Sequence, residues 1–237
     1  MTYQVEYATE QDAIGLGCIN NDSFQTRLML SAMFPETDEP SLRTYKSYQT
    51  MKHLASPEAH VLKVRDPSSG VIVGYGRWQI PAVLGVPPNV PELSEQAQIY
   101  AKDPVAFAPQ PMDKEVYAAF RRLLDEGRKR YTTDRDMSRF SAILQAPHLL
   151  ISVIVLDLLA TLPSHQGRGI GSALIRWGTQ LADSLQTRIY LEATPEGYPI
   201  YLKYGWKRLE EVELDIEKFG GHGKESFILM MRDPVPQ

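Results

Sequence analysis

The segment from Leu156 to Ser172 limits what this chain can fold into more than any other. Its sequence, LDLLATLPSHQGRGIGS, begins as an apolar, strand-like run and then places glycines at positions 167, 169 and 171, just before a helical pattern. Glycine tolerates positive φ and lets the backbone approach a ligand, and the first N–H groups of a helix have no partner inside it. A strand, a glycine-rich loop and a helix in this order predict a cradle for a phosphate or pyrophosphate group.

Composition narrows the classes of protein to consider. The chain has 237 residues, of which 43% are hydrophobic and 23% charged, and a net charge of −4, so a soluble globular protein is expected and nucleic acid is not. No apolar run is long enough for a membrane span, and the first residues do not resemble a secretory signal. Cys18 is the single cysteine and the five histidines lack metal-ligand spacing, so we expect neither an internal disulfide nor a metal site. A lone cysteine suits a reducing compartment, so we expect a cytoplasmic or nuclear protein. We further expect a monomer or a homodimer.

Hydrophobic periodicity predicts the element order βααββ, an insertion, and then βαβαββ. Seven prolines fall within residues 81–111, so we expect residues 81–148 to be an insertion, Pro-rich and then helical, in a single α/β domain that spans residues 1–237. The basic residues of its helix, Arg128 among them, fit a solvated face better than an anion site. The expected elements are a strand at 3–7, helices at 8–21 and after Ser41, a hairpin of 59–65 and 71–79, a helix after Asp113, a strand at 149–162, a helix to about 184, a strand at 188–193, a short helix at 199–204, and strands at 212–216 and 226–231.

Several kinds of glycine-rich loop have to be weighed. A nucleoside-triphosphate loop needs a lysine after its last glycine, and none is present here. A dinucleotide-binding loop needs GxGxxG, but the spacing here is GxGxG and Leu174 stands where the last glycine belongs; only Glu192, about 20 residues further on, fits that motif. A tight turn that binds nothing is the plain alternative.

Two motifs at the right separation resemble the Gcn5-related N-acetyltransferase (GNAT) superfamily. Residues 166–171, QGRGIG, match the pattern (Q/R)xxGx(G/A), and residues 191–206, LEATPEGYPIYLKYGW, resemble the family's fifth strand and next helix, whose usual ending is YxxxGF. Here Trp206 replaces the phenylalanine. The resemblance is strong over residues 156–206, plausible in topology over 3–79, and silent over 81–148. It implies a mixed, mostly antiparallel central sheet, flanked by helices, whose fourth and fifth strands splay apart.

The resemblance implies an acetyl-CoA-dependent N-acetyltransferase that acts on a primary amine of a small molecule or peptide by direct attack in a ternary complex. Backbone N–H groups of the loop would hold the pyrophosphate of the coenzyme, and the pantetheine arm would lie along the end of the fourth strand. A non-catalytic CoA-binding module of the same fold is the alternative. The positions that the resemblance assigns to the coenzyme are Leu159, Ala160, Thr161, Leu162, Gln166, Gly167, Arg168, Gly169, Ile170, Gly171 and Ser172.

Three residues are candidates for proton transfer. Asp157 interrupts an apolar strand, so it is either the base that deprotonates the amine or a residue at a strand bulge that bonds to backbone. Glu192, on the next strand, is a second candidate base, or a surface charge paired with Arg188 or Lys203. Tyr201 matches the family's general acid by its spacing to the glycine of the YxxxGF motif and would protonate the thiolate of CoA, or it is an aromatic side chain that the helix buries.

The acceptor is less well defined by the sequence. In this family the first helices, the third-strand region and the last hairpin build the acceptor site, so Phe24 and Trp78 are expected there, with core positions as the alternative. Tyr198 is a further candidate for contact with the substrate. Neither the amine nor the acyl chain length follows from the sequence.

Overall fold

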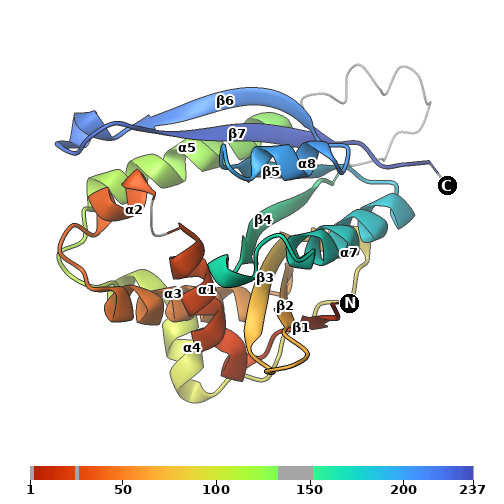
Figure 1. The fold of residues 1–237 in the computed structure, drawn as a ribbon, viewed down its shortest axis with the longest axis horizontal. Coiled ribbons are helices and arrows are strands. Elements are labelled where there is room, and N and C mark those ends of the chain that lie inside the picture. Colours follow the sequence, from red (N-terminus) through yellow and green to blue (C-terminus); the bar gives the residue numbers. More distant parts are fainter. Residues whose placement is uncertain (1–2, 25–26, 133–151, 237) are drawn as a thin grey trace.

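The computed structural model describes residues 3–24, 27–132 and 152–236. Within these residues seven strands form one sheet in the order β1-β2-β3-β4-β5-β7-β6, and every neighbouring pair is antiparallel except β4 and β5 (Figure 1). The expected mixed, mostly antiparallel sheet is therefore confirmed. The strands are β1 (Val5–Tyr7), β2 (Ala59–Arg65), β3 (Ile72–Gln79), β4 (Ile154–Thr161), β5 (Ile189–Ala193), β6 (Lys207–Asp215) and β7 (Lys224–Arg232).

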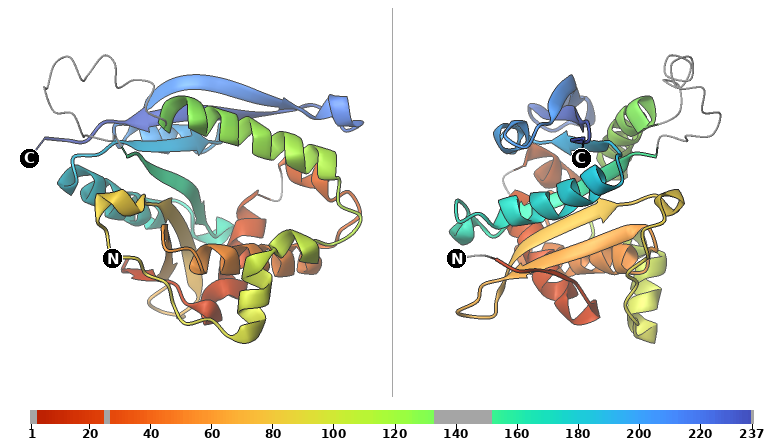
Figure 2. Two further views of the ribbon diagram at one scale, coloured as in Figure 1. Left: turned by 180° about the vertical axis from the view of Figure 1, so that it is seen from behind. Right: turned by 90° about the vertical axis from the view of Figure 1, so that its right-hand side faces the viewer.

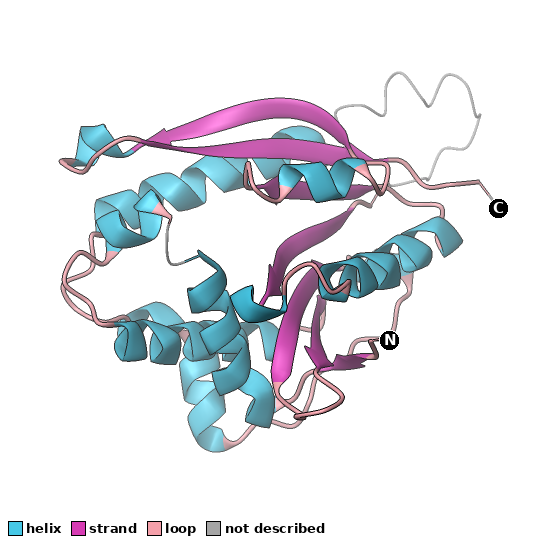
Figure 3. Cartoon of the chain, viewed as in Figure 1, coloured by secondary structure: helices cyan, strands magenta, loops and turns pink. Residues whose placement is uncertain are grey.

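Helices cover both faces of this sheet, as two further views of the ribbon and the cartoon show (Figures 2 and 3). Helix α7 packs on β3 and β4 on one face, while α1 packs on β3 and β4, α3 on β2, and α5 on β5 and β6 on the other face. None of the helices in the described ranges is long and apolar enough to cross a membrane. The helices are α1 (Ala13–Phe24), α2 (Leu28–Met33), α3 (Glu39–Leu54), α4 (Glu95–Lys102), α5 (Lys114–Thr132), α7 (Ile170–Ser184) and α8 (Tyr198–Leu202).

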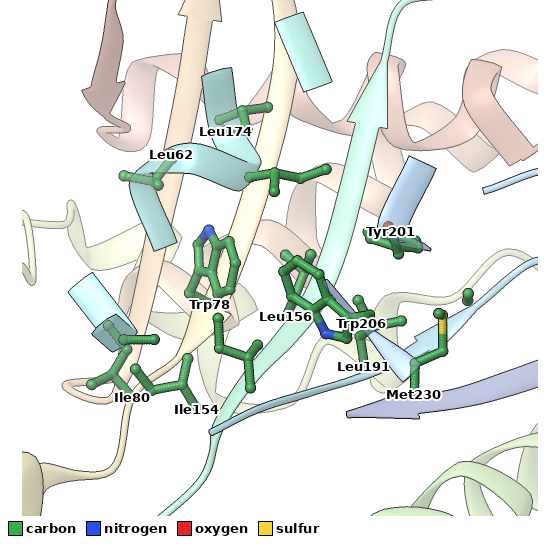
Figure 4. Packing of buried hydrophobic residues seen from close by; sticks show 14 of the residues in the cluster. Leu62, Trp78, Ile80, Ile154, Leu156, Leu174, Leu191, Tyr201, Trp206 and Met230 are labelled. Carbon is green, nitrogen blue, oxygen red and sulfur yellow. The ribbon is translucent and has the colours of Figure 1, made fainter. Parts of the chain in front are cut away.

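Glycines let α7 lie close to the sheet. A Cβ atom on Gly178 of α7 would stand 2.2 Å from the ring of Trp78, and one on Gly74 of β3 would stand 2.4 Å from Ile170. Trp78 is fully buried in this interface, where Figure 4 shows it among Leu62, Leu174 and Ile154. Trp78 therefore occupies a core position, the alternative weighed for it, and its ring fills the core on the α7 face.

Side-chain caps begin several of the helices. Thr9 and Asp12 form a capping box ahead of α1, and Asp113 Oδ1 accepts the N–H groups of the first turn of α5. Helix α3 begins earlier than expected: Asp38, not Ser41, caps it, since Asp38 Oδ1 accepts the Ser41 N–H at 2.8 Å. Strands β6 and β7 are longer than the alternation predicted, because their pairing continues beyond the apolar residues.

The expected insertion between the third and fourth strands is more regular than its prolines suggested. It contains α4, which begins where Ser94 Oγ accepts the Ala97 N–H, and α5, whose Gly127 packs against Leu229 of β7. Helix α4 was not predicted from the sequence because prolines lie close on both sides of it. The eight residues from Glu95 to Lys102 contain no proline themselves, so the helix can form. The predicted insertion from 133 to 148, and the first residues of the strand predicted at 149–162, lie outside the described residues.

Candidate active site

The parallel strands β4 and β5 separate at the centre of the sheet. Their register pairs Ile154 with Ile189 and continues only to Leu156 and Leu191, while β4 goes on to Thr161 paired with β3 (Figure 1). The far half of β4 therefore has backbone groups that face no strand on the β5 side. This is the splay that the resemblance implied.

The hydrogen bonds of β4 show which of its backbone groups are free. The Leu162 N–H donates to Val73 O at 3.0 Å, so the amide of Leu162 is directed at β3. Amides alternate along a strand, so Ala160 is directed the same way, and the N–H groups of Leu159 and Thr161 face the splay. Of the four residues that the resemblance assigned to the pantetheine arm, Leu159 and Thr161 have backbone groups in position to pair with a ligand, and Ala160 and Leu162 do not.

The loop that follows β4 presents a row of unpartnered backbone donors. Gly167 and Gly169 adopt φ of +75° and +87°, a region that other residues rarely enter. The first backbone bond inside α7 joins Ala173 N to Gly169 O, and no N–H of residues 167–172 donates to any atom in the described parts of the chain. The open amides, at the positive end of the α7 dipole, are arranged as donors suited to an anion.

The side chains of this loop are exposed and leave the amides clear. Gln166 Nε2 donates to Thr161 O at 3.4 Å, and Arg168 Nη2 donates to Ser164 O at 3.2 Å. Both glycines have open space where a Cβ would stand, so glycine is required here for φ rather than for room. The loop is thus held open by its backbone conformation and is not closed by its own contacts.

Four charged side chains meet beside the splay, on the face opposite α7. Asp157 of β4 accepts from Arg77 Nε of β3 at 2.6 Å and from Arg128 Nη2 of α5 at 3.0 Å. Arg128 also pairs with Glu192 Oε2 of β5, at 3.1 Å. Asp157 lies at a β-bulge, where the register skips from Leu158 opposite Arg77 to the next pair. Sequence reasoning missed both arginines, although a carboxylate inside an apolar strand signals that a buried cation has to be near.

The pKa values of Asp157 and Glu192 are shifted in opposite directions. Burial alone would raise the pKa of Asp157, but Arg77 and Arg128 outweigh it and hold that pKa well below its usual range. Burial raises the pKa of Glu192, and Arg128 offsets this only in part. Glu192 is therefore the stronger base of the two. The solvated role expected for Arg128 was wrong, and so was the surface pairing weighed for Glu192, whose side chain is 6% exposed.

The remaining candidate residues lie on the helices around the splay. Tyr201 of α8 is buried, packs against Trp206 at 5.7 Å between ring centroids (Figure 4), and has its pKa raised by burial. Phe24, at the end of α1, is half-buried against the cluster that holds Ala160, and Tyr198 opens α8. No group of His, Cys, Asp or Glu side chains among the described residues is arranged to hold a metal ion.

Part of this sequence is similar to known proteins. Residues 105–206 match the acetyltransferase (GNAT) family. A probable acyltransferase, SID5, from Ajellomyces capsulatus is 43% identical over 44 residues, which cover 19% of this chain; the match spans 32%, about a third, of that relative's length.

Solved structures resemble the whole fold. One from Corynebacterium glutamicum, described as histone acetyltransferase HPA2 and related acetyltransferase, superposes with a TM-score of 0.57 at 20% identity and covers 100% of this chain and 99% of its own. The PaiA N-acetyltransferase from Thermoplasma acidophilum, solved in complex with coenzyme A, has a TM-score of 0.50 at 10% identity over 98% of this chain and 99% of its own. At these identities the likeness concerns the fold. Taken with the family match over residues 105–206, which include the glycine loop and the YxxxGW motif, it indicates that this part of the chain resembles a GNAT acetyltransferase domain.

Proposed function

We propose that this protein transfers an acetyl group from acetyl-CoA to a primary amine of a small molecule or peptide. The observation that carries the proposal is the row of free N–H groups from Gly167 to Ser172 next to the open edge of β4. A diphosphate fits donors of this kind, and an extended amide chain fits a strand edge with free backbone groups. Acetyl-CoA would supply the activated acyl group as a thioester.

Particular residues would bind the coenzyme. The amides of the loop and the α7 N-terminus would hold the pyrophosphate, with added charge from Arg168. Leu159 and Thr161 would pair with the pantetheine arm, and the Leu159 N–H would polarise the thioester carbonyl as an oxyanion hole does. Ala160 and Leu162 would contribute apolar contacts instead of hydrogen bonds.

Two residues would move protons. Glu192 would take the proton that the amine loses as its nitrogen bonds to the acyl carbon, because its raised pKa makes it a better acceptor than Asp157. Tyr201 would give its proton to the sulfur as the carbon–sulfur bond breaks, and its raised pKa keeps the hydroxyl protonated until that step. Asp157 would hold Arg128, and through it Glu192, in place.

Binding and turnover test the proposal separately. Equilibrium dialysis should show CoA binding, and an amine panel with acetyl-CoA should release free thiol. We expect Glu192→Gln and Tyr201→Phe to lower kcat on the order of 10²-fold or more, within the usual contribution of general acid–base catalysis, while CoA affinity stays within about twofold. Binding without turnover on any amine would leave a CoA-binding module, and no binding would refute the cradle itself.

A further inference from the structure

One face of α3 carries polar side chains toward the charged cluster. Lys46, Thr50 and His53 are spaced four and then three residues apart, so they lie along one stripe of the helix. Thr50 Oγ1 lies 3.4 Å from the hydroxyl of Tyr75, and Arg77 Nη1 lies 3.5 Å from the same hydroxyl. The middle of the stripe is therefore fixed on β3, and Lys46 lies one turn before it.

Lys46 has no counter-charge in the part of the chain that the structure describes. Its side chain is partly buried, and its ammonium makes no ion pair and no hydrogen bond with any other residue of the described ranges. Burial, and after it the charge of Arg77, lower the pKa of Lys46 to about 8, so the group still carries a charge at neutral pH. Burial and Arg77 also lower the pKa of His53 to about 3, so that ring is neutral.

The charges around the stripe do not balance. Lys46, Arg77 and Arg128 are cations, whereas Asp157 and Glu192 are the carboxylates that meet them. Both carboxylates already bind guanidinium groups, which leaves one positive charge over. A buried, unpaired ammonium is costly, and a ligand that brings one negative charge would remove that cost.

We propose that the acceptor amine of this enzyme bears a carboxylate, and that Lys46 binds it, with Thr50 beside it on the same stripe. This inference rests on the proposed function, since it names the substrate class of the same site. A carboxylate carries one negative charge and matches the excess, whereas a phosphate monoester carries between one and two. The amine would then point toward Glu192, on the far side of the ion-pair cluster from α3.

Matched substrate pairs test the charge requirement. We would measure kcat/KM by thiol release for ω-amino acids from glycine to 6-aminohexanoate, each against its own carboxamide. The wild type should prefer at least one acid over its carboxamide by about tenfold or more. Lys46→Met should bring that ratio to about one by raising KM for the acid, and Lys46→Arg should keep most of the preference.

A control on the same helix separates this effect from a change in fold. Lys52 of α3 is exposed, and Lys52→Met should leave the ratio unchanged. The melting temperature of Lys46→Met should equal or exceed that of the wild type, because an unpaired buried charge is removed.

The outcomes separate failure of the carboxylate proposal from failure of the acetyltransferase proposal. Equal rates on acid and carboxamide in every pair, or a preference that survives in Lys46→Met, would overturn the carboxylate while the acetyltransferase proposal stands. CoA binding with turnover on neither member of any pair would also overturn the carboxylate, and the acetyltransferase proposal would fall with it only if the wider amine panel likewise gave no turnover.

Discussion

Removal of the Arg128 guanidinium is the most informative perturbation of this structure. In Arg128→Met, Asp157 keeps Arg77 at 2.6 Å, but Glu192 loses the one cation within ion-pair distance of it among the described residues. Removing one partner of a buried pair costs about 3–5 kcal/mol. Because one of the two carboxylates remains paired, we expect the lower end of that range, about 3 kcal/mol at pH 8.

The loss should depend on pH in a defined direction. Burial already raises the pKa of Glu192, and without Arg128 it rises further. A carboxyl group with a raised pKa contributes stability below its unfolded pKa of about 4.3, and this contribution is lost as pH rises through the folded pKa. The difference between Arg128→Met and the wild type should therefore be smaller at pH 5 than at pH 8.

Urea unfolding at the two pH values measures this difference. Arg122→Met is the control, because Arg122 is exposed on the same helix and its loss should change the free energy of unfolding by less than about 0.5 kcal/mol. If Arg128→Met matches Arg122→Met at pH 8, or loses as much stability at pH 5 as at pH 8, the buried ion pair is not what holds α5 to the sheet.

Other substitutions probe the loop, the core and the first helix. Gly169→Val should weaken CoA binding at least about tenfold in calorimetry, because a φ of +87° excludes a β-branched residue. The control is Gly85→Val, at an exposed glycine with a φ of +70°, which should leave the affinity for CoA unchanged. Equal affinities of the two variants would refute the proposed anion site. Gly178→Ala should cost about 1–3 kcal/mol in thermal unfolding, since its Cβ meets the Trp78 ring, and an unchanged melting temperature would show that α7 can shift freely. Asp12→Asn should cost about 2 kcal/mol of unfolding free energy at pH 7. The pKa of Asp12 is lowered in the folded state, so its carboxylate stabilises the fold only above the pKa of the unfolded state, and the cost should vanish as pH falls through the folded pKa. A constant cost from pH 7 to pH 2 would contradict this.

Signals within a few residues of the sequence predicted most of the helices and strands, and also the glycine-rich loop before α7. The capping residues before α1 and α5, the DPSSG turn between β2 and β3, and the glycines before α7 all act within a few residues, so each could be interpreted without the rest of the chain. Helix α4 and the start of α3 were missed, since a neighbouring proline or a second possible cap hid the signal.

Contacts between distant residues could not be predicted in the same way. Arg77, Arg128 and Glu192 are 51 or more positions apart in the sequence, and no periodicity relates them. Trp78 alternates with Arg77 along one strand, so periodicity left open which of the two faces α7. Burial against Gly178 decided it.

The amino-acid sequence by itself determined the kind of fold, the strand–loop–helix proposed to hold an anion, and the family motifs, because these depend on neighbouring residues and on backbone conformation. Only the tertiary structure decided which of the two buried carboxylates has the higher pKa and which amides of β4 are free among the described residues. Both depend on what packs beside them: a guanidinium group lowers a pKa or offsets burial only from the position to which the fold brings it.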